Sequence, residues 1–190
     1  MSDFEYLTVL IAIILGIGTA HLVMSVGRIL GETKTLNISV AHSIWTANIL
    51  TFLVVTWWWG INLRELQEWV FLHYFFLLFV TLLWCLMAAI LYPRAIPPEF
   101  DLKAHFARKR KSFFSILVLL AFADPSASMI LGTEHLVDLG WPYLHLMLAC
   151  LIGGIAGIRY DNERFHVAFA IYWGLSLTVA VLSWQFSVVV

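Results

Sequence analysis

The sequence predicts an all-α integral membrane protein with six transmembrane helices in a single domain, residues 1–190. Two observations predict this fold class. The chain is 62% hydrophobic and only 12% charged, whereas about a quarter of the residues of a soluble domain are charged. Lipid therefore has to cover most of its surface. The apolar residues also gather in six runs, each close to the roughly 20 residues that a helix needs to cross a bilayer.

The six predicted spans are separated by short polar segments. They cover approximately residues 4–27, 40–63, 69–92, 112–132, 141–158 and 165–188. Helices are expected because hydrocarbon offers the backbone no hydrogen-bond partner, and the runs are too long and too uniformly apolar for barrel strands. Asp3 and Glu5 precede the first run, where a cleavable signal peptide would carry basic residues. We therefore expect the first run to be a span.

The basic residues predict the orientation. Of the 11 Lys and Arg residues, Arg64 alone follows an even-numbered span; the others belong to the segments after spans one, three and five. The positive-inside rule places these basic segments in the cytoplasm. We expect a bacterial inner-membrane protein with both termini on the non-cytoplasmic side.

The longest connecting segment, residues 93–111, is predicted to be a basic cytoplasmic loop. Leu102 and Phe106 lie four residues apart, so they share a helix face that could rest on the membrane surface. Anionic lipids are the predicted partners of its basic run, which is Arg108, Lys109, Arg110 and Lys111. A protein partner for this loop stays open, but the patch is too short and too close to the membrane to favour nucleic acid.

A weak internal repeat joins the two halves of the chain. Two segments align with small gaps: Gly60-Ile61, Arg64, Glu68 and His73, and Gly157-Ile158, Arg159, Glu163 and His166. With three spans per half, the second half would enter the membrane from the opposite side. The pattern thus suggests a 3+3 inverted-topology repeat, which is typical of transporters that bind solute near the midplane. Alternatively, these residues only cap and anchor helix ends.

Polar residues inside the spans are the candidate site. Asp124 lies within the fourth span beside Pro125, with Ser128 one turn further. An intramembrane carboxylate is a candidate for binding a cation or a proton, although it could also be structural and accept hydrogen bonds from the broken turn or pair with a histidine. His21 and Ser25 share a face of the first span, and we expect them to line a hydrated cavity with Asp124.

Other intramembrane polar groups allow further interpretations. Asn48 in the second span is a pathway candidate or an interhelical hydrogen-bond partner. Histidines at two levels of the membrane could hold haem b between facing helices; these haem-ligand candidates are His73, His145, His42 and His166. Against haem, His42 and His166 lie near the interface. Their protonation could instead gate a channel.

The sequence motifs give little support for a function other than transport. Cys85 and Cys150 are isolated within apolar runs, so they predict neither a disulfide framework nor a metal site. Gly153, Gly154 and Gly157 include a G-x-x-x-G spacing, which favours close helix packing. No catalytic motif is recognised, and no enzyme is predicted.

The expected function is a channel or transporter for an ion or small solute, with flux linked to protons or pH. A haem-binding electron carrier and a non-catalytic accessory subunit of a larger membrane complex are the alternatives. Self-association is also open.

Overall fold

The structure is a computed structural model that describes residues 3–31, 37–65, 70–93, 100–129, 132, 136–137 and 139–185. The described chain is all-helical, and six of its helices are long and apolar enough to cross a membrane. The protein is therefore a multi-pass integral membrane protein, as predicted. Its spans are α1 (Asp3–Gly31), α2 (Val40–Trp59), α3 (Phe71–Leu91), α4 (Leu102–Ser128), α6 (Gly140–Arg159) and α7 (Glu163–Gln185). A short 3₁₀ helix, η1 (Gly60–Glu65), follows α2.

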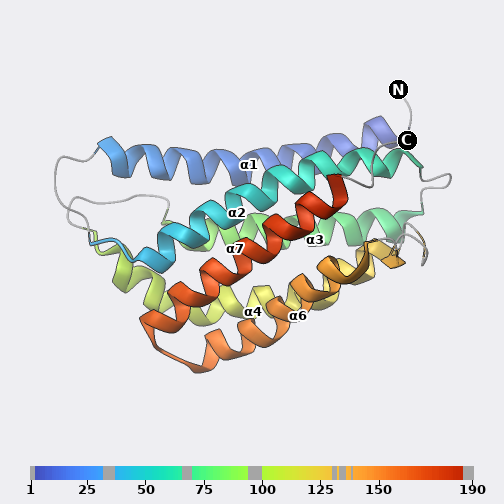
Figure 1. Cartoon of the computed structure of the whole chain (residues 1–190). Helices are drawn as coiled ribbons and strands as arrows, with labels where there is room; N and C mark the ends of the chain where they lie inside the picture. The colour runs from blue at the N-terminus through green and yellow to red at the C-terminus, as the bar shows by residue number, and fades with distance from the viewer. Residues whose placement is uncertain are drawn as a thin grey trace.

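The six helices form a closed ring. In the order α1, α2, α7, α6, α4, α3, each packs on the next, and α3 returns to α1. Figure 1 shows α1 and α6 along opposite edges, with α2 and α7 on the near side and α3 and α4 behind them.

Aromatic side chains fill the centre of this ring. Trp45, Trp84 and Trp173 come from α2, α3 and α7 and are fully buried. Phe52 stacks on Trp84 with ring centroids 3.7 Å apart, and Trp45 meets the edge of Phe113 at 5.0 Å. Such large rings contribute strongly to burial energy, and here they occupy the axis along which a central pore would have to run.

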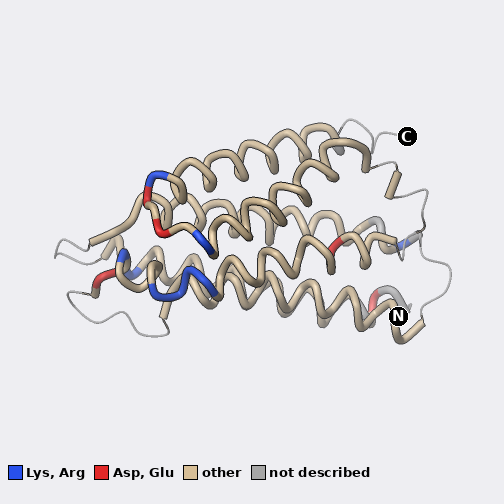
Figure 2. Tube along the Cα trace, turned by 90° about the horizontal axis from the view of Figure 1, so that it is seen from below, with Lys and Arg blue, Asp and Glu red and all other residues tan. Residues whose placement is uncertain are grey.

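Charge is distributed unequally between the two ends of the bundle (Figure 2). One end, which we call the basic end, carries the last turn of α1, the first turns of α4 and the junction of α6 with α7. Arg64 of η1 lies at the other end, which we call the opposite end, together with the start of α1 and the end of α7 (Figures 1 and 2). The basic end matches the predicted cytoplasmic segments, and its orientation in the cell stays a prediction.

The predicted interfacial loop is partly wrong, because α4 begins at Leu102 rather than near residue 112. Asp101 caps this start by accepting the Ala104 backbone N–H at 2.8 Å, a common N-cap arrangement. Leu102 and Phe106, expected to face the membrane surface, are buried in the bundle instead. The basic run therefore belongs to the helix that continues into the fourth span.

The ring order contradicts the predicted inverted repeat. In that repeat α1, α2 and α3 would correspond to α4, α6 and α7, so the packing of α2 on α7 would require α6 to pack on α3. Instead α4 separates α3 from α6 in the ring. The aligned glycines also differ, since Gly60 begins η1 whereas Gly157 lies inside α6. The two halves of the ring therefore do not pack with the symmetry that the repeat would require.

Candidate functional site

Asp124 is held by α6. It lies one turn before the end of α4, and its Oδ1 accepts a hydrogen bond from the hydroxyl of Tyr143 at 2.8 Å. Ser128 Oγ lies 3.2 Å from the same hydroxyl oxygen. Asp124 thus faces protein, and its partner is a tyrosine of α6 rather than a histidine or the broken turn.

His21 and Ser25 lie elsewhere, in the half of α1 toward the basic end. Ser25 is buried and its hydroxyl donates to the His21 carbonyl at 2.7 Å. The His21 Nε2 atom is buried without a hydrogen-bond partner among the described residues. Since Asp124 lies near the opposite end, the structure does not form the predicted cavity shared by these residues.

Asn48 joins two helices. Its side-chain amide donates to the Ala170 carbonyl of α7 at 2.8 Å. Gly174 permits this approach, because a Cβ atom there would come within 2.5 Å of Asn48 Oδ1. This geometry is the interhelical hydrogen bond expected from the sequence.

The histidines predicted as haem ligands do not fit a haem. The Phe106 ring contacts both members of the first pair, with centroids 5.9 Å from His42 and 6.3 Å from His166, so a phenyl ring occupies the space between them. His42 Nε2–H also donates to the Leu91 carbonyl at 2.8 Å. The Nδ1 atom of His42 and both ring nitrogens of His166 have no hydrogen-bond partner among the described residues, so it is the position of Phe106 that speaks against a haem here.

The second pair fails for a different reason. His73 and His145 belong to α3 and α6, which are not neighbours in the ring. The His145 Nε2 atom is hydrogen-bonded to the Tyr172 hydroxyl at 2.8 Å. Across the described ranges, no group of three or more His, Cys, Asp or Glu side chains could hold a metal ion.

Arg110 has a structural role in place of the lipid contact predicted for it. It is only 6% exposed, and its Nη1 donates to the carbonyls of Gly157, Ile158 and Tyr160 at 2.7, 3.2 and 2.6 Å. It therefore caps the C-terminal end of α6, where a cation is favoured. Arg110 is not free to bind lipid headgroups as predicted, whereas its neighbours Lys109 and Lys111 are exposed.

Glycines bring α6 close to α4 between these two polar contacts. A Cβ atom at Gly157 would lie 2.7 Å from the Phe114 ring, and one at Gly154 would lie 2.7 Å from Val118 Cγ2. The close packing predicted from the glycine spacing is confirmed here. Together with the hydrogen bonds of Arg110 and Asp124, this close packing holds α4 against α6 along their length.

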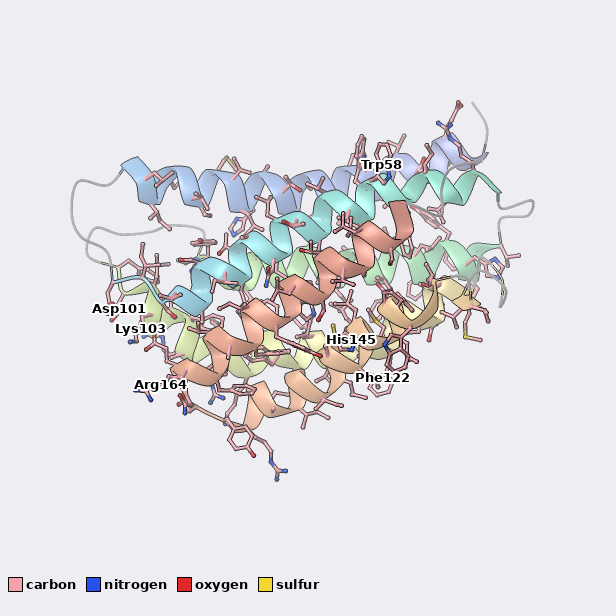
Figure 3. The ribbon with its side chains drawn as sticks, in the orientation of Figure 1. Trp58, Asp101, Lys103, Phe122, His145 and Arg164 are labelled. Carbon is pink, nitrogen blue, oxygen red and sulfur yellow. The ribbon has the colours of Figure 1, made fainter. Side chains whose placement is uncertain are left out.

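Two cavities flank α1. The opposite-end cavity, about 360 Å³, lies between α1, α2 and η1. Trp58 of α2, one of its lining residues, stands beside α1 in Figure 3. The basic-end cavity, about 460 Å³, lies between α1, α3 and α4. Its lining residues are Ile17, Gly18, His21, Cys85, Ala89, Ile90, Tyr92, Pro93, His105 and Lys109.

A thin packed layer separates the cavities along α1. Leu15 is 2% exposed, and a Cβ atom at Gly18 would lie 3.3 Å from Leu53 Cδ1 and 3.5 Å from Cys85 Sγ. Each cavity includes one permanent cation, Arg64 or Lys109, and the described linings contain no Asp or Glu. The basic-end cavity is therefore suited to a neutral or anionic ligand.

Comparisons with protein-family models, with curated proteins and with solved structures give no match for this chain. Function has to be inferred from the cavities and the helix contacts.

Proposed function

We propose that this protein carries a small solute or ion across the membrane along α1, outside the packed centre of the ring. The supporting observation is the pair of cavities on the two flanks of α1, one toward each end, with the Leu15–Gly18 layer between them. A carrier needs a binding region reachable from each side and a barrier that changes sides.

α1 is the helix best suited to such a movement. Only 22% of the residues in its most apolar stretch are buried, against 39–44% in the other five spans. A small shift of α1 between α2 and α3 would enlarge one cavity and close the other. With the basic end in the cytoplasm, as the positive-inside rule favours, the basic-end cavity would be the cytoplasmic one.

A disulfide between α1 and α3 tests this mechanism. A Cβ atom at position 18 would lie 3.5 Å from both Cα and Sγ of Cys85, which is close enough for a disulfide after small adjustments. Gly18→Cys would therefore cross-link to the native Cys85 on oxidation. In proteoliposomes, we expect flux of at least one of three probes: protons, inorganic phosphate or labelled phosphatidylglycerol. That flux should stop on oxidation of the Gly18→Cys protein and return on reduction.

The matched control carries Gly18→Cys and Cys85→Ser, so it cannot form the cross-link and should be insensitive to oxidation. Flux that persists through the cross-linked protein would show that α1 need not move. If none of the three probes crosses faster than in protein-free liposomes, the carrier proposal fails.

A second candidate function is that of an accessory subunit, because α1 exposes a stripe of small residues. Gly16, Ala20 and Gly27 are all exposed, and a Cβ atom at either glycine would meet no other atom within 4 Å. Small residues at such spacing let another transmembrane helix approach closely. Gly16→Leu should then reduce the mass of any assembly measured by light scattering in mild detergent, and an unchanged mass would argue against this candidate.

A further inference from the structure

The basic-end cavity opens on the outer surface of the helix ring. α3 forms its floor, with α1 and α4 on either side. Ile17 is 60% exposed and Ala89 is also exposed, whereas their neighbour Ala88 is buried in the core. The cavity therefore faces the lipid side of the protein, and its walls are largely apolar.

Lys109, His105 and His21 are among the residues that line this apolar cavity. Lys109 is exposed and forms no ion pair within the described part of the chain. His105 Nε2–H donates to the Ile90 carbonyl at 3.1 Å, which orients its ring. The His21 Nε2 atom has no protein partner. Because the lining holds Lys109 and no carboxylate, the cavity is complementary to an anion.

Lys109 lies at the depth in the membrane that is expected for a lipid headgroup. The hydrogen bond between His105 and the Ile90 carbonyl places the start of α4 level with the end of α3, and Lys109 lies one turn further along α4. This level is just before the apolar part of α4, where the bilayer surface is expected. Basic pockets between transmembrane helices at such a surface bind acidic lipid headgroups.

We infer that the basic-end cavity binds an anionic phospholipid from the adjacent leaflet, with its phosphate at Lys109 and one acyl chain along Ile17, Gly18 and Ala89. The opposite-end cavity has a similar composition, with Arg64 beside the exposed Trp57 and Trp58. Naming the phospholipid as the transported species rests on the proposed function, whereas its binding rests on the basic-end cavity alone.

Lipid competition measured by native mass spectrometry tests the binding. The full-length protein, delipidated in detergent, is supplied with equal amounts of phosphatidylglycerol and phosphatidylcholine. We expect a preference for phosphatidylglycerol that falls about fivefold in Lys109→Gln, corresponding to the roughly 1 kcal/mol that one basic residue contributes near an anionic surface. Ala89→Phe should reduce binding of both lipids by filling the apolar floor.

Lys111→Gln is the matched control, because Lys111 is exposed on the same helix but does not line the cavity. An equal loss in Lys109→Gln and Lys111→Gln would mean diffuse surface attraction and overturn the inference. An octanoate arm separates lipid from soluble amphiphile: binding of octanoate through Lys109 without a phosphatidylglycerol preference would overturn the phospholipid assignment.

The binding and flux measurements fail independently. Lipid preference is measured without a membrane, so its absence leaves the carrier proposal standing. Conversely, an intact preference with no flux of any probe would reject the carrier and keep the lipid site.

Discussion

The contact between α4 and α6 differs from the contacts of α1 with α2 and α3. Between α4 and α6, Arg110 closes one end, Asp124 and Tyr143 close the other, and glycines allow the backbones to approach between them. Along α1, the packed layer at Leu15 and Gly18 separates two cavities. The α4–α6 pair is held together at both ends and along its length, whereas α1 has a cavity on each flank.

This difference shows that an ionisable residue inside a span is not functional by its identity alone. Asp124 accepts a hydrogen bond from Tyr143, which offsets part of the cost of burial and favours a structural role. His21 has a buried nitrogen without a partner, and it lines a cavity. A buried polar atom without a partner calls for an explanation, and an unobserved ligand is one such explanation.

Among changes to the α4–α6 contact, the removal of Arg110 should cause the largest loss of stability. Arg110→Leu would leave three carbonyls at the end of α6 without their donor, and hydrogen bonds to charged groups contribute about 1.5–3 kcal/mol each. We expect a loss of about 3 kcal/mol or more, seen as earlier thermal unfolding by tryptophan fluorescence in detergent. Arg108→Leu, at an exposed position, should change stability by less than about 0.5 kcal/mol. Equal effects would refute the capping role.

Substitution of one glycine in α6 and one in α1 compares how tightly the two helices are packed. Gly154→Ala would place a Cβ atom 2.7 Å from Val118 Cγ2 and 3.3 Å from the Phe114 carbonyl oxygen, and overpacking of this kind costs about 1–3 kcal/mol. Gly16→Ala on α1 meets nothing within 4 Å and should be tolerated. Thermal unfolding of both variants would measure the contrast, and similar losses would show that α1 is as tightly packed as α6.

Asp124 should prove structural rather than part of the transport path. Asp124→Leu leaves the Tyr143 hydroxyl without its carboxylate acceptor, with an expected loss of about 1–2 kcal/mol. Asp124→Asn keeps an acceptor oxygen, so stability and flux in proteoliposomes should stay close to those of the unchanged protein. A large change of flux in Asp124→Asn with normal folding would return this residue to the site.

The smallest effect is expected at the start of α4. The Ala104 backbone N–H, with help from the Asn37 amide, holds the pKa of Asp101 below its ordinary value. Because the folded-state pKa is the lower one, the stabilisation is present above the unfolded-state pKa and is lost as pH falls through the folded-state pKa. Thermal unfolding between about pH 5 and pH 2 should show this decline. Asp101→Asn, which cannot ionise, should flatten it.

The positions of individual side chains follow from helix register, which composition does not report. Arg110 and Lys111 are adjacent and equally basic, yet one is buried and the other exposed. The register could have been read from Leu102, Phe106 and Phe113, which share the buried face of α4 with Arg110. The N-cap pattern at Asp101 was the signal that α4 begins early.

The sequence by itself determined membrane residence, the number of spans and the concentration of basic residues at one end, because these depend on the composition and length of single segments. It also indicated close packing at Gly154 and Gly157, since glycine spacing is a local property. Only the tertiary structure decided the ring order, the aromatic centre, the partner of Asp124, the burial of Arg110 and the cavities beside α1. Each of these depends on which helices become neighbours, and in a bilayer that choice is made by the fit of side chains between apolar helices of similar composition.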